Sequence, residues 1–236
     1  MSSAPVAVSV ILPAFNEEAL LAGCVRQLHG SLASLRVPVE IIIVNDGSRD
    51  RTAEIADQLA RDLPGVVAVH QANQGIGGAF RTGTKVATGE YLILWPADMP
   101  AEPADLAPYT EQFGKADVIV GVRQARLGYN PLMRLNAWLY PRITAMLFGL
   151  RLRDVNWIHA YRRELFARIT LTQRGIPMLV EALVRLRDLG ASFVEVDVVM
   201  KQRLGGVASA SRLKVMWRTL TGVLSFWKLW RKERRS

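Results

Sequence analysis

The sequence has 236 residues, of which 50% are hydrophobic, so a single domain can bury a sizeable core. Lys and Arg outnumber Asp and Glu by 30 to 21, and the net charge of +9 favours anionic partners such as phosphorylated substrates, acidic lipids or nucleic acid. The single cysteine, Cys24, excludes an internal disulfide and a cysteine-based zinc site, the first residues lack a secretory signal, and no apolar stretch reaches the roughly 18–20 residues of a membrane-spanning helix.

The first 121 residues alternate between two kinds of pattern. Short runs rich in β-branched residues predict strands, and the segments between them place apolar residues at spacings of three and four, which predicts helices. The predicted strands are residues 6–12, 39–44, 66–70, 90–95 and 117–121, and the predicted helices are residues 17–32, 51–63 and 77–87. Such alternation predicts a parallel sheet with helices on both faces, whose ligands bind at the carboxyl ends of the strands.

The second half of the sequence is rich in Arg and large apolar residues, and it contains one more predicted strand, residues 192–199. We find no repeat and no linker there, so we expect this half to complete the same domain and to shape an acceptor site. The last segment predicts a helix, and we divide the chain into a domain of residues 1–207 and a helical appendage of residues 208–236.

That last helix is amphipathic. Its predicted apolar side consists of Leu213, Met216, Trp217, Leu220, Leu224, Trp227 and Trp230. Its predicted polar side consists of Lys214, Arg218, Thr221, Ser225, Lys228 and Lys232. A Trp-rich side opposite a basic side is typical of a helix that lies on a membrane surface, but a helix packed against its own domain shows a similar stripe.

Polar residues follow the ends of the first two predicted strands. The first ends in LPAFNEE, where Asn16, Glu17 and Glu18 are expected to open a helix, and the second ends in VNDGSRDRT. Asp46 stands at the end of the second strand, where a carboxylate can bind ribose hydroxyls or a base edge. Asp-Gly is also a common turn pair, so this motif is ambiguous by itself.

A glycine-rich segment, NQGIGGAFRTG, follows the third predicted strand. Gly75 and Gly77 let the backbone approach a ligand closely, and Arg81 follows at a distance from which it can meet a phosphate. Phe80 occupies the third glycine position of the pattern Gly-x-Gly-x-x-Gly. This departure, and the place of the loop after the third strand, argue against a dinucleotide site.

Taken in order, these motifs, the strand that ends in Ala97-Asp98, and VGVR at residues 120–123 resemble the family 2 glycosyltransferases, in particular the polyprenyl-phosphate sugar synthases. The later segments DVNWIHAYRREL and RLGGVASASRLK are similar to downstream motifs of that branch. The resemblance implies a GT-A fold, a Rossmann-like and mostly parallel sheet flanked by helices. It also implies an enzyme that transfers a sugar, with inversion, from a nucleotide-diphosphate donor to a polyprenyl phosphate.

The resemblance further implies roles for the matching residues. The nucleotide-sugar would be bound by Pro13, Phe15, Glu17, Asp46, Gly75, Arg81 and Ala97. The catalytic residues would be Asp98, Arg123 and Arg203, and the acceptor phosphate would be neutralised by Arg123, Arg126, Arg203 and Lys214. A phosphate acceptor is already an anion, so no general base is required. Mg²⁺ or Mn²⁺ at Asp98 would offset the charge on the departing nucleoside diphosphate.

Two positions depart from the pattern of that branch. Pro96 replaces the first acid of an Asp-x-Asp pair, which removes one oxygen ligand and predicts a weakened metal site. Asp98, two diphosphate oxygens and waters can still complete an octahedron. His159 stands where the branch usually has a Ser-Gly-Phe-Arg-like run, and packing among aromatic residues is its commoner role, with substrate contact as the alternative.

Two other functions remain open at this point. Transfer to a saccharide or other hydroxyl acceptor would require a base, for which Glu181 and His159 are the candidates. A nucleotide-sugar-binding protein, in which Pro96 has abolished catalysis, is the second alternative. Nucleic acid is not an expected partner, because the sequence has no helix-turn-helix and no aromatic-basic platform. We expect a cytoplasmic protein, peripheral on the inner face of the cell membrane, and the sequence determines neither the sugar nor the oligomeric state.

Overall fold

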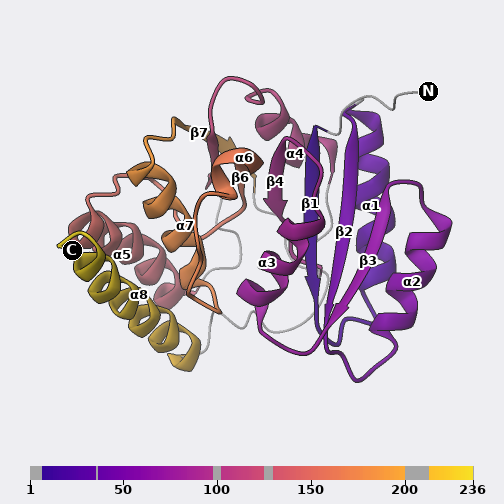
Figure 1. Ribbon diagram of the computed structural model, residues 1–236, viewed down its shortest axis with the longest axis horizontal. Helices are drawn as coiled ribbons and strands as arrows, with labels where there is room; N and C mark the ends of the chain where they lie inside the picture. The colour runs from indigo at the N-terminus through magenta and orange to yellow at the C-terminus, as the bar shows by residue number, and fades with distance from the viewer. Residues whose placement is uncertain (1–6, 36, 98–101, 125–129, 200–212, 236) are drawn as a thin grey trace.

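The computed structural model describes residues 7–35, 37–97, 102–124, 130–199 and 213–235, and its centre is one sheet (Figure 1). The seven strands lie in the order β3-β2-β1-β4-β6-β5-β7. They are β1 (Val8–Ala14), β2 (Val39–Asp46), β3 (Val66–Gln71), β4 (Tyr91–Leu94), β5 (Val118–Arg123), β6 (His159–Arg162) and β7 (Phe193–Val198). β6 runs antiparallel to its neighbours β4 and β5, and the other pairs are parallel. The predicted, mostly parallel α/β architecture is confirmed.

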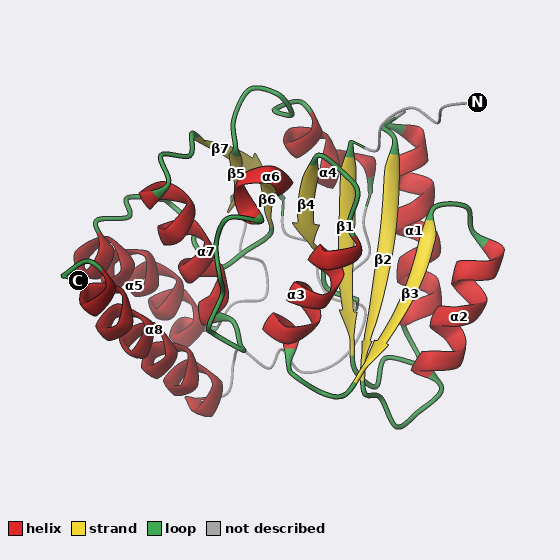
Figure 2. Cartoon of the chain, in the orientation of Figure 1, coloured by secondary structure: helices red, strands yellow, loops and turns green. Residues whose placement is uncertain are grey.

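Helices cover both faces of the sheet (Figure 2). One face packs against α1 (Leu21–Ser34), α2 (Thr52–Asp62) and α4 (Pro103–Thr110). The other packs against α3 (Ile76–Val86), α5 (Pro131–Phe148), α6 (Arg163–Phe166), α7 (Pro177–Asp188) and α8 (Leu213–Glu233). In β1, Val10 and Leu12 belong to the first core and Ile11 to the second. Burial on both faces explains why the strands are nearly continuous apolar runs.

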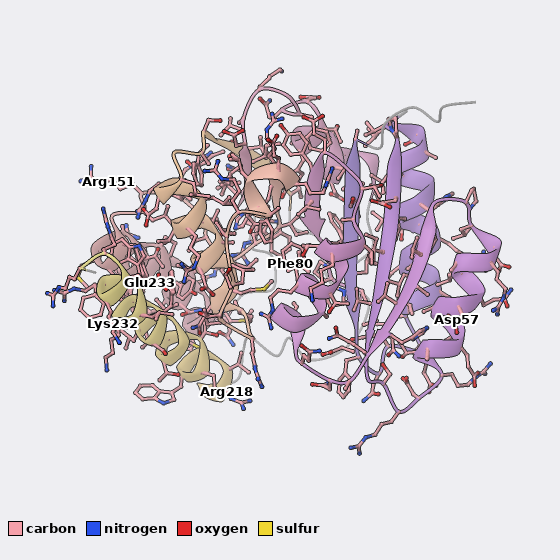
Figure 3. The ribbon with its side chains drawn as sticks, in the orientation of Figure 1. Asp57, Phe80, Arg151, Arg218, Lys232 and Glu233 are labelled. Atoms are coloured by element: carbon pink, nitrogen blue, oxygen red, sulfur yellow. The ribbon has the colours of Figure 1, made fainter. Side chains whose placement is uncertain are left out.

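The second core joins the two halves of the chain. Phe80 of α3 lies near the middle of the molecule (Figure 3). Its ring is 5.5 Å from that of Phe166 and 6.3 Å from that of Tyr161, centroid to centroid. These aromatic pairs connect α3 to β6 and α6, so the glycine-rich segment and the later motifs belong to one packed unit.

One predicted helix boundary is wrong, and one strand was missed. The first helix begins at Leu21 and not at residue 17. Asn16 has a φ of 56°, outside the helical range, and the amides of Glu17 and Glu18 donate to the side chains of Thr52 and Asp50 in the loop after β2. The short strand β6 was not predicted from its pattern. It has four residues, and its antiparallel place between β4 and β5 is set by contacts with strands distant in sequence.

Helix α8 packs on its own domain. Val223 and Phe226 are fully buried and Trp230 is 8% exposed, so all three lie in the core shared with α5 and α7. Trp217 and Leu224, predicted on the apolar side, are instead 68% and 38% exposed. The buried side of α8 is therefore rotated relative to the predicted apolar side. In the described part of the chain, no helix has both the length and the apolarity needed to cross a membrane.

Candidate active site

Most of the predicted site residues that the structure describes lie along one edge of the sheet, at or just after the carboxyl ends of strands, and Arg81 lies in α3. β1, β2, β4 and β5 run in the same direction and end at this edge. β6 runs antiparallel to β4 and β5, so it begins there. His159, the first residue of β6, pairs with Val120 near the end of β5. This is the edge where sheets of this class bind ligands.

The loops that follow β1 and β2 are locked together by hydrogen bonds. The Asn16 amide donates to Ser48 Oγ over 3.0 Å, and the Glu17 amide donates to Thr52 Oγ1 over 2.8 Å. The ring of Phe15, at the end of β1, is left 46% exposed beside them. An exposed aromatic ring beside two loops joined in this way can stack on a base. Binding of the nucleotide-sugar by Phe15 stays a prediction.

Asp46 holds the loop between β3 and α3. It is only 3% exposed, and Oδ1 accepts from Gln71 Nε2 over 2.6 Å and from the Gln74 amide over 2.8 Å. Oδ2 accepts from the Gly75 amide over 2.8 Å. The structure thus brings together two predicted nucleotide-sugar residues, Asp46 and Gly75. A direct contact of Asp46 with a nucleoside stays a prediction.

The close approach at the glycine-rich segment is made by the chain's own backbone. The Gly77 amide donates to the Arg174 carbonyl over 2.8 Å, and Arg81 Nη1 donates to the Gln173 carbonyl over 3.2 Å. A Cβ atom at Gly77 would lie 2.7 Å from the Gln173 oxygen, too close for any other residue without a shift. The start of α3 is therefore fixed by the segment 173–174, a contact that the sequence did not reveal.

Glu181, one of the two candidate bases, shapes that same segment. Its side chain is fully buried and accepts from the amides of Thr172 and Gln173 over 2.9 and 2.8 Å. It also accepts from Thr172 Oγ1 over 2.9 Å and from Arg185 Nε over 3.0 Å. A carboxylate so enclosed and so fully bonded is a structural group, and no substrate can reach it in this arrangement.

At the end of β5, Arg123 forms a buried ion pair with Asp154. Nε and Nη2 donate to the two carboxylate oxygens over 2.7 and 2.8 Å, and the guanidinium lies 4.8 Å from the ring centroid of Trp157. Burial alone would raise the pKa of Asp154, but the bonds and the charge of Arg123 outweigh it and hold that pKa below its usual range. The fork-like pairing fixes the orientation of the Arg123 side chain.

A cavity of about 60 Å³ adjoins this ion pair. It is lined by Arg123, Asp154 and Asn156 and, from α5, by Met133, Asn136, Ala137, Tyr140 and Pro141. The sequence had not assigned a role to Asp154 or to the start of α5. An acid close to Trp157 within the quoted motif DVNWIHAYRREL was the signal present, but a partner for it could only be named once β5 and β6 were known to be neighbours.

His159, the other candidate base, is packed within the protein. It is 1% exposed, and neither ring nitrogen has a hydrogen-bond partner among the described residues. Burial lowers its pKa to about 4, so the ring is neutral at neutral pH. Its ring meets that of Tyr161 edge to face. Packing is therefore the role that the structure supports.

The predicted metal ligand, Asp98, comes after the end of β4 in the sequence. Trp95 and Ala97 are buried, Pro96 offers no oxygen ligand from its side chain, and Asp98 lies outside the described residues. Among the residues that the structure does describe, no three His, Cys, Asp or Glu side chains form a group able to hold a metal. The described donor set therefore does not by itself fit a metal.

Three other predicted residues cannot be placed. Arg126 and Arg203 lie outside the described residues, and Lys214 belongs to α8 but its side chain is not described. Of the predicted acceptor-phosphate residues, the structure therefore places Arg123 alone, in the ion pair with Asp154.

Comparisons with known proteins find similar sequences and similar structures. Residues 9–170 match the family model Glycosyl transferase family 2. The uncharacterized glycosyltransferase EpsJ of Bacillus subtilis is 33% identical over 175 residues, 70% of this chain and 50% of that protein. The undecaprenyl-phosphate 4-deoxy-4-formamido-L-arabinose transferase of Pseudomonas aeruginosa is 28% identical over 215 residues, 89% of this chain and 62% of that protein. The chain thus spans between half and two thirds of the length of these relatives.

Two solved structures share the fold. Glucosyl-3-phosphoglycerate synthase of Mycobacterium tuberculosis, solved with Mn²⁺, UDP and phosphoglyceric acid, superimposes with a TM-score of 0.71 at 20% identity over 93% of this chain and 78% of its own. Mannosyl-3-phosphoglycerate synthase of Rubrobacter xylanophilus does so with a TM-score of 0.74 at 19% identity over 98% of this chain and 76% of its own. At 19–20% identity, these likenesses show the GT-A fold alone.

Proposed function

The chain belongs to glycosyl transferase family 2, and on that basis we propose that it transfers a sugar, with inversion, from a nucleotide-diphosphate donor to a polyprenyl phosphate at the cytoplasmic face of a membrane. The donor's nucleoside would lie against Phe15 and Glu17, beside the loop that Asp46 holds. The acceptor phosphate would approach Arg123 at the neighbouring end of the sheet.

The burial of both candidate bases is the observation that carries this choice of acceptor. A hydroxyl acceptor must lose a proton during the reaction, so a base has to reach it. Glu181 is fully buried and His159 is 1% exposed. Asp154 lines the cavity, but Arg123 holds its pKa below the usual range, which makes it a weak base. A phosphate oxygen is already ionised and needs no base, so it suits this site.

The extent of one likeness supports the same choice. The family model ends at residue 170, whereas the match to the undecaprenyl-phosphate transferase of P. aeruginosa runs over 215 residues. It therefore continues past the end of the family model through α7 and β7, whereas α5 and the cavity beside Arg123 lie within both matches. The two solved structures, by contrast, are named as synthases of glucosyl- and mannosyl-3-phosphoglycerate, and phosphoglycerate is a small phosphorylated acid. The shared chemistry of the two groups is an acceptor that bears a phosphate.

A divalent metal remains part of the proposal through Asp98 alone. When bound, Mg²⁺ or Mn²⁺ would neutralise charge on the departing diphosphate. The neighbour from M. tuberculosis was solved with Mn²⁺ in one structure and with Mg²⁺ in another. Because Pro96 provides no ligand, we expect weak metal affinity and a requirement for more metal than an Asp-x-Asp enzyme needs.

The test is transfer of labelled sugar from UDP and GDP donors to three acceptors in parallel: a short-chain polyprenyl phosphate, 3-phosphoglycerate and a free saccharide. We expect labelled polyprenyl phosphate, and labelled phosphoglycerate or saccharide in its place would overturn the proposed acceptor. Each reaction is run with Mg²⁺, with Mn²⁺ and with chelator. Product that persists in chelator would contradict the metal at Asp98.

The variant Pro96→Asp separates a weakened enzyme from a protein that only binds the donor. Restoring the first acid should raise activity and reduce the metal concentration needed, since it adds one oxygen ligand. Pro96→Ala is the matched control, because it removes the ring without adding a ligand. Donor binding without transfer in all three proteins would favour the binding-only alternative.

A further inference from the structure

Helix α5 has an apolar side that the core does not use. Leu135, Trp138, Leu139 and Met146 are 55%, 53%, 41% and 77% exposed. Their spacing puts them on one side of the helix. The buried residues of α5, on its opposite side, are Tyr140, Thr144 and Phe148. An apolar group of this kind on a protein surface marks an interaction site far more often than scattered single residues do.

Helix α8 extends this surface. It lies beside α5 at the end of the molecule opposite α1 and α2, in both Figure 1 and Figure 2. Trp227 of α8 donates its indole N–H to the Leu147 carbonyl of α5 over 3.0 Å. The exposed Trp217 and Leu224 share a side of α8 with Trp227 by helical spacing, so they flank α5. We call these six residues, four on α5 and two on α8, the α5–α8 face.

The charges around the α5–α8 face are positive. Exposed cations on the two helices are Arg134, Arg142, Arg218, Lys228, Arg231 and Lys232, of which Figure 3 labels Arg218 and Lys232. Residues 131–148 contain no Asp or Glu. The acid of α8, Glu233, forms an ion pair with Arg185 of α7. Tryptophan and aliphatic side chains among arginines and lysines, without a free acid on α5, are complementary to an anionic bilayer surface.

Arg142 shows how apolar and charged groups are combined on this face. Its guanidinium lies 3.9 Å from the ring centroid of Trp138, and Nη1 donates to the Trp138 carbonyl over 2.7 Å. The cation is thereby held over the aromatic ring at the surface. Such a pair places an apolar ring and a positive charge at the same depth, which suits the headgroup region of a bilayer.

The other side of α5 lines the cavity beside Arg123. One helix thus has an exposed apolar side and, on its opposite side, residues that adjoin the predicted acceptor site. Tyr140 illustrates the inner side, since it lines the cavity and its buried hydroxyl has no partner among the described residues. An acceptor anchored in a bilayer beneath α5 would have a short path to this cavity.

We propose that the α5–α8 face lies on an anionic membrane surface and that α5 forms the wall between that surface and the acceptor cavity. The part that concerns the acceptor rests on the proposed function, whereas the membrane contact does not. The sequence had predicted this contact for the last helix alone. In the structure most of the proposed contact surface belongs to α5, because α8 turns one side towards the core.

The test measures sedimentation of the protein with vesicles of phosphatidylcholine, alone or mixed in equal amounts with phosphatidylglycerol. We expect binding to the mixed vesicles that added salt weakens, because screened surface charges attract less. The double variant Leu139→Ser, Met146→Ser should lower the partition coefficient by about a hundredfold, about tenfold for each apolar group removed. The matched control is Val67→Ser, Val86→Ser, whose residues are 40% and 44% exposed in β3 and α3, and it should bind as the wild type does.

Transfer is measured with the same proteins, using a water-soluble short-chain acceptor and an acceptor embedded in the vesicles. The α5 variant should keep transfer to the soluble acceptor and lose most transfer to the embedded one. Equal vesicle binding by the α5 variant and the wild type would overturn the proposal. So would self-association of the wild type that the α5 variant abolishes, in the absence of vesicle binding, because it would assign the face to a second copy. Vesicle binding that depends on α5, without transfer to any acceptor, would support the membrane contact and contradict the proposed function.

Discussion

Replacing His159 by Phe should make the protein markedly more resistant to mild acid. His159 is 1% exposed, and burial lowers its pKa from 6.5 to about 4. The unfolded chain takes up a proton at this residue as the pH falls below 6.5, while the folded protein does not. The contribution of the neutral His159 to the free energy of unfolding is therefore fully present above that pH and is lost as the pH falls from 6.5 towards 4.

The size of the effect follows from the difference in pKa. One pKa unit corresponds to about 1.4 kcal/mol, so this histidine removes about 3 kcal/mol of the free energy of unfolding across that interval. A phenylalanine has no proton to bind, and it also removes two ring nitrogens that have no partner among the described residues. We expect the variant to be at least as stable as the wild type at neutral pH and to lose much less stability on acidification.

The assay is urea unfolding of both proteins at a series of pH values between 6.5 and 4. His70→Gln is the matched control, because the His70 side chain is 41% exposed and contacts Asp57 at the surface. This control should keep the acid sensitivity of the wild type. If His159→Phe loses stability as steeply as the wild type does, His159 is not the group that titrates, and the reasoning from burial fails.

Three further variants test the contacts around the site. Gly77→Ala should weaken nucleotide binding and lower the free energy of unfolding by about 1–3 kcal/mol, because the new Cβ would lie 2.7 Å from the Gln173 oxygen. Calorimetry with UDP measures the first effect, and thermal unfolding measures the second. Glu181→Ala should cost about 3–5 kcal/mol in urea unfolding by stripping a buried network, and unchanged stability with lost transfer would instead restore Glu181 as a base. Asp154→Ala should cost a similar amount, since it removes the buried carboxylate that accepts two hydrogen bonds from Arg123. The comparison with Asp154→Asn in the same assay shows how much is due to charge.

The architecture of the sheet and the positions of most strand-end motifs follow from local sequence patterns. Strands buried on both faces must be nearly continuous apolar runs, so β1, β2 and β5 are visible from composition over a few residues. Residues such as Phe15 and Asp46 follow directly after such runs. Because parallel strands end at a common edge, the order of strands and motifs along the chain is enough to predict that these residues lie near one another.

Which of these side chains meet each other, and which are enclosed, depends on the tertiary structure. Arg123 and Asp154 are 31 residues apart in the chain, and their pairing depends on β6 inserting antiparallel beside β5. Helical spacing showed that α8 is amphipathic, but the rotation that buries Phe226 and exposes Trp217 depends on its packing against α5 and α7. Local pattern fixes which residues share a side of an element. Which side faces the core is a property of the packed whole, because burial depends on neighbours that the local sequence does not contain.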